Sequence, residues 1–225
     1  MVSVRYLGHA SFEIEINGKI IYTDPWFNNN PSQFKRLVKS AGNSELIRKA
    51  DFVLISHEHS DHLDPFDAAR IVERCSAQLI GPEESISQIN VNPRLKNTVR
   101  VGDSFDLNGV SFQVIEAKHP QSSYPVGYLI KSGGESVYFA GDTYDFYAML
   151  KIDCKVAIIP IGGTYTMDSY SAVKAMKMMK AKYVIPCHYD TFDKIKVDIR
   201  DFQQRAKRDS KSEVIVLAVG ERITV

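Results

Sequence analysis

The sequence has little of several features that would point to particular classes of protein. Its 225 residues hold 28 Lys and Arg against 27 Asp and Glu, for a formal net charge of +1. A charge so close to neutrality argues against a protein that coats nucleic acid. The three cysteines lie far apart and form no C-x-x-C pair. This excludes a zinc finger or a thioredoxin-type motif, and the odd number argues against a disulfide framework.

Long hydrophobic runs are also missing. The longest, such as residues 214–219, fall far short of the roughly 20 apolar residues that cross a bilayer. The beginning of the chain has neither the charged nor the apolar region of a secretory signal. We therefore expect a reduced, cytoplasmic protein with no membrane partner. The apolar fraction of 44% and the charged fraction of 24% are ordinary for a globular protein and exclude a disordered chain.

Hydrophobic patterning predicts an α/β protein rich in strands. Residues 11–16 alternate between apolar and polar side chains, as a half-buried strand does, whereas residues 52–56 are typical of a strand buried on both faces. We expect strands at 11–16, 19–23, 52–56, 78–80, 98–101, 111–116, 126–130, 136–140, 156–161, 183–185 and 214–218. Helices are expected at 65–75, 169–180 and 198–208. Residues 26–50 are expected to form a loop followed by one or two short helices.

The two halves of the chain resemble each other. In the first half a strand pair surrounds Asn17-Gly18, a strong hairpin signal, and ends at Asp24. In the second half a strand pair surrounds Gly133-Gly134 and ends at Asp142. A buried strand and a helix follow each pair. This long repeat predicts two similar sheet-and-helix halves packed face to face, with the chemistry in a cleft between strand ends.

Three of the six histidines fall within six residues, in the stretch His57-Glu58-His59-Ser60-Asp61-His62. This stretch follows a buried strand directly and precedes Asp64-Pro65, which suit the N-cap and first position of a helix. Neutral imidazoles and carboxylates are ligands of divalent metals. His57 and His59 can point at one centre and Asp61 and His62 at another, so the loop favours a two-metal site.

Further candidate ligands follow other strands. His119, Asp142 and His188 each lie just past the carboxyl end of an apolar strand. Alone, each has an ordinary interpretation as a loop or surface residue. Beside the loop from His57 to His62, the three are better explained as metal ligands.

The spacing His57-x-His59-x-Asp61-His62, followed by His119, Asp142 and His188, resembles the metallo-β-lactamase superfamily over nearly the whole chain. Gly8-His9-Ala10, Asp24-Pro25, residues 160–167 and residues 186–192 are similar to a family of metal-dependent hydrolases related to L-ascorbate-6-phosphate lactonase. The resemblance implies one domain over residues 1–225 with a four-layer αββα sandwich. Glu58 and Ser60 depart from the small residues of many relatives, and neither departure removes a ligand.

The resemblance also implies a ligand set. His57, His59 and His119 hold a first metal, Asp61, His62 and His188 hold a second, and Asp142 bridges them. No cysteine replaces a ligand, so zinc, manganese and iron all remain open. Two such ions generate a bridging hydroxide that attacks a small ester, lactone or phosphoester, and Asp61 is expected to hold the proton of the attacking water.

Other functions stay open at this point. They are a nucleic-acid or lipid phosphodiesterase and a metal-binding protein without catalysis. The near-neutral charge disfavours nucleic acid, and no amphipathic membrane helix is evident. We therefore expect a small-molecule substrate, with homo-oligomer formation left open.

Five residues outside the ligand set receive predicted roles. His9, the one histidine not assigned as a ligand, is expected either to donate a proton to the leaving oxygen or to support a ligand from behind. Asp24 is a candidate acceptor for a ligand imidazole. Tyr165 and Tyr189 lie closest in sequence to the site and are predicted to contact substrate. Cys187, although beside His188, is expected to be structural because no free histidine remains to act as its base.

Overall fold

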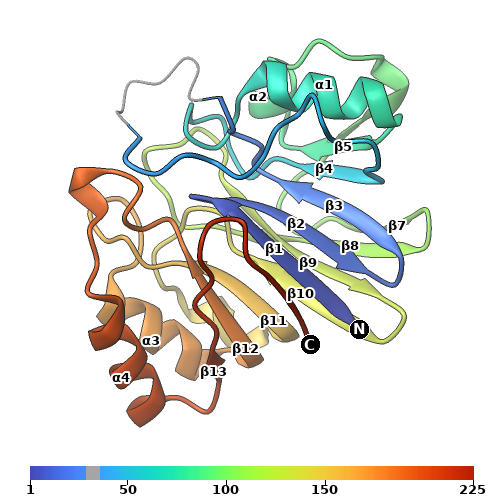
Figure 1. The fold of residues 1–225 in the computed structure, drawn as a ribbon. Coiled ribbons are helices and arrows are strands. Elements are labelled where there is room, and N and C mark those ends of the chain that lie inside the picture. The colour runs from blue at the N-terminus through green and yellow to red at the C-terminus, as the bar shows by residue number, and fades with distance from the viewer. Residues whose placement is uncertain (29–35) are drawn as a thin grey trace.

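The computed structural model describes residues 1–28 and 36–225, which form two stacked sheets of seven strands each (Figure 1). The first sheet has the order β14-β1-β2-β3-β4-β5-β6 and the second β13-β12-β11-β10-β9-β8-β7. The strands of the first sheet are β1 (Val2–Gly8), β2 (Ser11–Ile16), β3 (Lys19–Thr23), β4 (Phe52–Leu54), β5 (Gln78–Gly81), β6 (Lys96–Thr98) and β14 (Arg222–Thr224). Those of the second are β7 (Ser104–Leu107), β8 (Val110–Glu116), β9 (Val126–Ser132), β10 (Glu135–Phe139), β11 (Asp153–Pro160), β12 (Lys180–Cys187) and β13 (Glu213–Val214).

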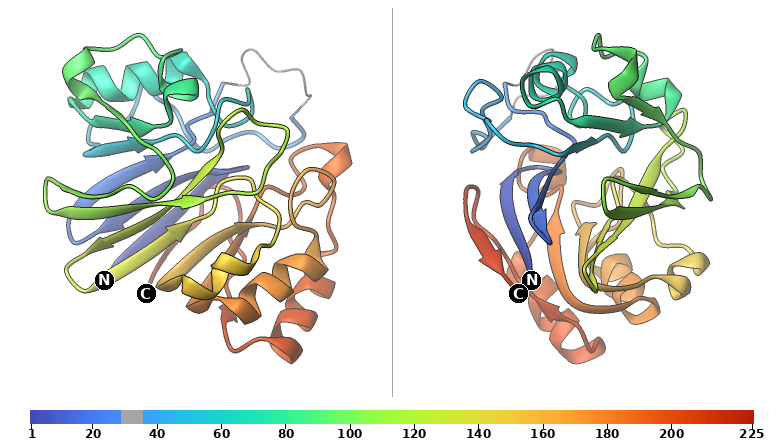
Figure 2. Two further views of the ribbon diagram at one scale, coloured as in Figure 1. Left: turned by 180° about the vertical axis from the view of Figure 1, so that it is seen from behind. Right: turned by 90° about the vertical axis from the view of Figure 1, so that its right-hand side faces the viewer.

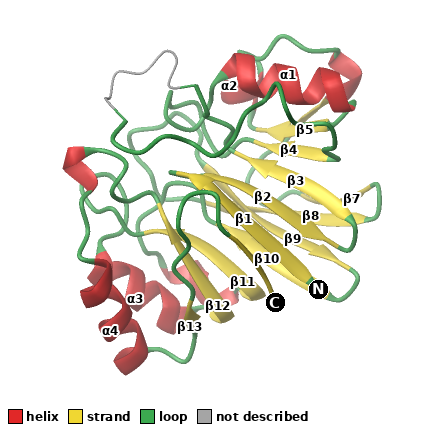
Figure 3. Cartoon of the chain, in the orientation of Figure 1, coloured by secondary structure: helices red, strands yellow, loops and turns green. Residues whose placement is uncertain are grey.

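Helices cover the two ends of the molecule. They are α1 (Pro65–Cys75), α2 (Glu83–Ile86), α3 (Ser169–Met178) and α4 (Ile199–Asp209), with short 3₁₀ turns at Pro93–Leu95, Tyr147–Lys151 and Asp193–Ile195. Figure 3 shows α1 and α2 at one end, α3 and α4 at the opposite end, and the strands between them. In the described ranges, 1–28 and 36–225, no helix is both long enough and apolar enough to cross a bilayer.

Side-chain alternation along the strands builds the layers. In β11, Val156 and Ile158 enter the core between the sheets, whereas Ala157 and Ile159 pack under α3 and α4. Successive side chains of a strand point to opposite faces, so a continuously apolar strand serves two cores. A third apolar cluster joins α1 and α2 to the first sheet. These clusters give four layers, α1/α2, sheet, sheet and α3/α4 (Figure 2), and the predicted αββα sandwich is confirmed.

The two sheets repeat one topology. A hairpin, β2–β3, leads into parallel β3, β4 and β5 in the first sheet. The β9–β10 hairpin leads in the same way into parallel β10, β11 and β12 in the second. Asn17 and Gly18 turn the first hairpin at positive φ, as do Gly133 and Gly134 in the second. The repeat predicted from the sequence is therefore a structural repeat.

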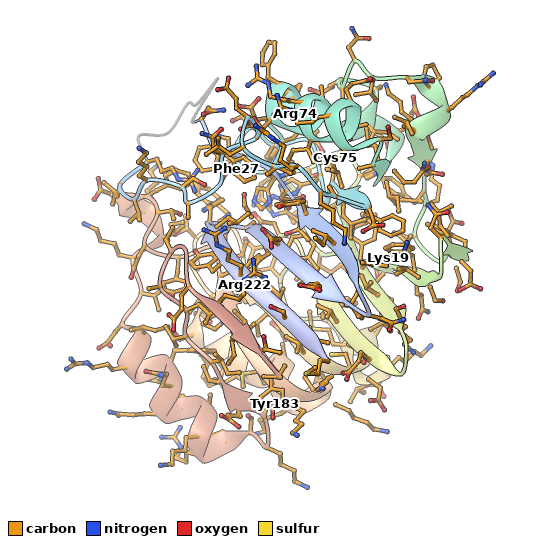
Figure 4. All side chains as sticks on the ribbon, turned by 45° about the vertical axis from the view of Figure 1, so that its right-hand side comes forward. Lys19, Phe27, Arg74, Cys75, Tyr183 and Arg222 are labelled. Carbon is orange, nitrogen blue, oxygen red and sulfur yellow. The ribbon has the colours of Figure 1, made fainter. Side chains whose placement is uncertain are left out.

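The outer face of β1 and β2 is polar. Phe12, Ile14 and Ile16 face the core between the sheets, while Glu13 and Glu15 alternate with them on the other side. Glu13 accepts a hydrogen bond from Tyr22 and forms an ion pair with Arg222 of β14. Figure 4 shows Arg222 over these strands and Lys19 near the turn that joins β2 to β3.

The segment from Trp26 to Ala50 differs from the prediction. No helix forms at 26–28 or 36–50, and residues 29–35 lie outside the described residues. The backbone here bonds to other elements instead of to itself. Ala41 N donates to Leu7 O of β1 at 3.0 Å, and the Ser44 hydroxyl donates to Asp67 of α1 at 2.6 Å. Phe27, seen near α1 in Figure 4, is anchored by its N–H to Asp67 as well.

Several element bounds also needed correction. The strand expected at 98–101 is β6, Lys96–Thr98, and the chain then turns at residues 100–103, where Asp103 N donates to Arg100 O at 3.0 Å. The strand expected at 214–218 is reduced to β13, Glu213–Val214. The strands β1, β7 and β14 and the short helix α2 are not among the expected elements, whereas α1 and the β2–β3 hairpin have the predicted bounds.

Candidate metal centre

The predicted ligands gather at one edge of the two sheets. The loop from His57 to His62 follows β4, and His119, Asp142 and His188 follow β8, β10 and β12. In each sheet these strands run in the same direction, since β8 and β10 are both antiparallel to β9 and β12 is parallel to β11. The carboxyl ends of all of them therefore meet at the cleft between the sheets.

His57, His59 and His119 form the first group of potential ligands. One ring nitrogen of each lies within 4.8 Å of the others. The nitrogen facing away has an oxygen partner in every case. His57 Nδ1 lies 2.8 Å from Ser56 Oγ, His59 Nε2 lies 3.1 Å from Gln121 O, and His119 Nδ1 lies 3.2 Å from Tyr165 O. These oxygens hold each imidazole so that its second nitrogen points to the common centre.

Asp61, His62 and His188 form the second group, and His9 lies in the same cluster. His62 Nδ1 lies 2.7 Å from Asp24 Oδ2, deep below the surface. Asp24 also accepts from the Ser56 backbone N–H at 2.7 Å and from the Ser56 hydroxyl at 2.6 Å. Asp24 thus has the predicted place behind a ligand imidazole, and through Ser56 it is connected to His57 as well.

Asp142 lies between the two groups. Its Oδ1 is 3.3 Å from His62 Nε2, and its Oδ2 is 3.1 Å from His188 Nε2 and 3.9 Å from His119 Nε2. Burial would raise the pKa of Asp142, but His188 and His62 beside it outweigh burial and lower the pKa well below its usual value. Asp142 is therefore a carboxylate in contact with both groups.

The donor atoms fit a divalent metal. His57 Nε2, His62 Nε2, His188 Nε2 and Asp142 Oδ1 are buried, and within the described part of the chain they have no hydrogen-bond partner. Buried polar atoms are nearly always hydrogen-bonded, so several orphans converging on one place call for another partner. Imidazole nitrogen with carboxylate oxygen suits zinc, manganese or iron.

The backbone at these strand ends adopts a conformation that is uncommon outside glycine. His9, Asp24 and His188 have φ of 61°, 38° and 54°. Left-handed backbone costs energy for residues with a side chain and clusters at functional sites. Gly141, before Asp142, also has positive φ, and a Cβ there would lie 2.7 Å from Ser56 Cβ. Sharp turns of this kind direct the side chains of the strand ends into the cleft.

Comparison with known proteins agrees with this geometry. The sequence model of the beta-lactamase superfamily domain matches residues 3–188. The chain belongs to the beta-lactamase superfamily. It is 32% identical to a UPF0173 metal-dependent hydrolase of Pyrococcus horikoshii, over 99% of each chain, and 35% identical to one of Hyperthermus butylicus, over 97% of each. Its fold superimposes on Igni18, a metallo hydrolase from Ignicoccus hospitalis, with a TM-score of 0.85 and 30% identity over 99% of this chain and 97% of that one.

This superfamily member is accordingly a metal-dependent hydrolase, as the ligand spacing indicated. The narrower relation to L-ascorbate-6-phosphate lactonase stays a prediction. The seven ligand assignments are predictions too, and the structure brings all seven side chains together at the cleft of the superfamily fold.

The cleft opens into a cavity of about 420 Å³ above the ligands of this hydrolase. Its lining combines acidic, imidazole and aromatic side chains: Glu58, His59, Ser60, Asp61, His119, Gln121, Asp142, Tyr165, His188 and Phe192. Tyr165 is at the cavity, as its predicted contact with substrate requires. Tyr189 is not among the lining residues, and it packs instead against the apolar cluster under α3 and α4.

His9 and Cys187 lie behind the cavity rather than in it. The ring of His9 is fully buried, and burial, with His188 beside it, lowers its pKa to about 3. A neutral ring that does not line the cavity is poorly placed to protonate a leaving group, so its role must be sought in what it contacts. Cys187 is buried in the core between the sheets, and burial raises the pKa of its thiol well above the usual value.

Sequence reasoning missed four residues that support or line the site. Ser56 and Gln121 supply the oxygens behind His57 and His59, Phe192 lines the cavity, and Thr191 contacts His9. Proximity was the available signal, because each lies within four residues of a predicted ligand. Proximity in sequence does not identify a role, because a serine or threonine beside a predicted ligand supports that ligand only when the backbone turns its side chain inward.

Proposed function

We propose that this hydrolase holds two divalent ions and hydrolyses a small ester, lactone or phosphoester. The observation that carries the proposal is the placement of Asp142. One of its oxygens faces the second group, at His62, and the other lies between His188 of the second group and His119 of the first. A carboxylate that reaches both groups of ligands suits a bridge between two ions better than a ligand of one.

The roles of the side chains follow from their positions. His57, His59 and His119 would hold one ion, Asp61, His62 and His188 the other, and Asp142 both. When bound, such ions lower the pKa of water and polarise the oxygen of the substrate. Asp61 also lines the cavity, so its carboxylate can accept a proton from the attacking water. Asp24 and Ser56 keep His62 and His57 in the tautomers that leave Nε2 free.

A small substrate fits the cavity. Small-molecule sites measure about 300–1,000 Å³, and the cavity of about 420 Å³ lies at the lower end of that range. Tyr165 and Phe192 offer aromatic surface on one side of it. The near-neutral net charge supports a small molecule over nucleic acid as the substrate. Zinc, manganese and iron all suit this ligand set.

Metal analysis and a substrate panel test the proposal. We expect about two transition-metal ions per chain by mass spectrometry and turnover of at least one aryl ester, lactone or phosphodiester. RNA and DNA belong in the same panel, at low and high salt. Glu116→Gln, which alters a partly exposed carboxylate at the end of β8 and outside the cavity lining, is a matched control. One ion per chain after reconstitution, or cleavage of nucleic acid alone, would overturn the proposal.

A further inference from the structure

His9 links a ligand to a residue outside the metal site. Its Nε2 lies 3.3 Å from Asp61 Oδ2, and its Nδ1 lies 2.5 Å from the hydroxyl oxygen of Thr191. Thr191 belongs to the loop after β12, whereas Asp61 belongs to the loop after β4. The imidazole thus spans the cleft between the two halves, behind the ligands.

The hydrogen-bond capacity of these groups determines which group donates in each of the two hydrogen bonds of His9. An ionised carboxylate only accepts hydrogen bonds, so the Asp61 side requires the proton of the neutral ring on Nε2. Nδ1 then carries a lone pair and can only accept. A threonine hydroxyl has one proton to donate, and among the described residues the hydrogen-bond partner of the Thr191 hydroxyl is His9 Nδ1. The hydroxyl of Thr191 therefore donates to His9, and His9 donates to Asp61.

The ring has little freedom to leave this arrangement. It packs against Trp26, Phe192 and His188, with centroids 5.4, 5.0 and 4.1 Å away. The backbone contributes as well, because His188 N donates to His9 O at 3.0 Å. Since the φ of His9 is 61°, the residue is held in an uncommon conformation by its surroundings. His9 thus supports two members of the second group, Asp61 by a hydrogen bond and His188 by packing.

Thr191 is held equally well. It is 2% exposed, and its carbonyl accepts from Leu37 N at 2.9 Å. Asp190 before it has φ of 55° and bonds to Ile195 and Val197 in the same loop. The position of the hydroxyl is therefore a property of the folded loop, and Thr191 can fix the orientation of the His9 ring.

We propose that Thr191 and His9 are positioning residues for Asp61: the Thr191 hydroxyl donates to His9 Nδ1 and so holds the ring in the orientation in which its Nε2 donates a hydrogen bond to the Asp61 carboxylate. The proposal rests on the proposed function for the role of Asp61 as a ligand of the second ion. It assigns His9 no proton transfer to substrate. Its effect is to hold Asp61 in the orientation in which it meets His62 and His188.

Nitrogen NMR of ¹⁵N-histidine-labelled protein tests the tautomer directly, with or without zinc. We expect His9 to carry its proton on Nε2 in the wild type and in Thr191→Ser, which keeps the hydroxyl. Thr191→Val removes the donor at nearly constant shape, so the proton should stay on Nε2 while the Nδ1 resonance moves to the position of a nitrogen that accepts no hydrogen bond. A wild-type proton on Nδ1, or an Nδ1 resonance that is unchanged in Thr191→Val, would overturn the proposal.

Zinc affinity, measured by competition with a chromophoric chelator, tests the consequence. Loss of an outer partner lowers metal affinity by about 10–100-fold. Thr191→Val should therefore raise one of the two zinc dissociation constants by that factor. Thr191→Ser should have dissociation constants close to those of the wild type. Thr166→Val, which removes another buried hydroxyl, from a contact with Met167 O, is the matched control.

His9→Gln distinguishes positioning from direct ligation. Its amide can still donate to Asp61, so it should bind zinc more tightly than His9→Ala. If His9 is itself a ligand, both variants lose the ion equally while Thr191→Val keeps it, and the proposal fails. A protein that binds a single ion would refute the two-ion function but leave the tautomer result standing, so the two failures are separable. His9→Gln also provides a second variant should Thr191→Val fold poorly.

Discussion

Most imidazoles at this site face two ways, with one nitrogen towards the candidate metal position and the other towards a supporting oxygen. Each of His57, His59, His62 and His119 has one nitrogen bonded to an oxygen behind it, from Ser56, Gln121, Asp24 and Tyr165 respectively. His188 differs, because its Nδ1 has no partner among residues 1–28 and 36–225. Its orientation depends on packing against His9 and on its own backbone. The second group is thus the more sensitive to changes in its surroundings.

Asp142→Asn should remove both ions together. The amide keeps the shape of the side chain, but it carries no charge and offers one oxygen in place of two, so neither group keeps its shared carboxylate. We expect metal analysis after gel filtration to find both ions depleted. Asp145→Asn, which alters a nearby carboxylate paired with Lys174 instead of the ligands, should keep them. Retention of both ions at wild-type affinity in Asp142→Asn would rule out the bridge.

Cys187→Ala tests the structural assignment of the thiol beside His188. Cys187 is 1% exposed and packs between the sheets, so the smaller side chain leaves a small void, and we expect a loss of about 1 kcal/mol in the free energy of unfolding. Metal content and turnover should stay close to the wild type. A loss of turnover by orders of magnitude with both ions retained would show that the thiol takes part in catalysis.

At the scale of elements, the sequence was most informative where local chemistry decides the structure. Asn17-Gly18 marked the β2–β3 hairpin, and Asp64 with Pro65 marked the start of α1, where the Asp64 carboxylate accepts from the first-turn N–H groups. β7 and the segment 36–50 were not predictable in this way. Their conformation depends on partners distant in sequence, such as β8 for β7 and Leu7 for Ala41.

The segments that follow β11 and β12 lie so close together that a single added methyl group would displace one of them. Gly162 follows β11, and a Cβ there would lie 2.1 Å from His188 O and 3.0 Å from Ile195 Cβ. Gly162→Ala should therefore displace His188 and weaken zinc binding by the second group, while the group formed around His57 keeps its ion. Zinc titration with two fitted dissociation constants measures this.

A second glycine separates this local effect from general loss of stability. In Gly81→Ala the new Cβ would lie 2.6 Å from Ile86 Cγ2, under α2 and outside the cavity lining. That variant should melt at a lower temperature but bind zinc like the wild type. Equal zinc affinities for Gly162→Ala and the wild type would mean that the β11 end does not position His188.

At the scale of the whole molecule, the internal repeat explains both what the sequence revealed and what it concealed. Matching hairpins before Asp24 and Asp142 indicated two similar halves, and the structure contains them as two sheets of one topology. The predicted ligands were recognisable because they follow strands. Their outer contacts were not, because Thr191 and His9 meet only when the two halves pack, 182 residues apart in sequence.

The predicted ligands come from both halves, so metal binding by them would link the two sheets. His57, His59, Asp61 and His62 come from loops of the first sheet, and His119, Asp142 and His188 from loops of the second. An ion that binds only the folded protein stabilises it by about 2.7 kcal/mol at a concentration of 100 times its dissociation constant. For a chain of this size, removing that contribution should lower the melting temperature by about 5–11 °C. Calorimetry with and without a chelator, followed by return of zinc, measures the shift.

Asp142→Asn should lose most of the response to the chelator, because it lacks the bridging carboxylate. If the wild type, shown to be metal-free by mass spectrometry, melted at the same temperature as the zinc-loaded protein, the ions would not connect the two halves.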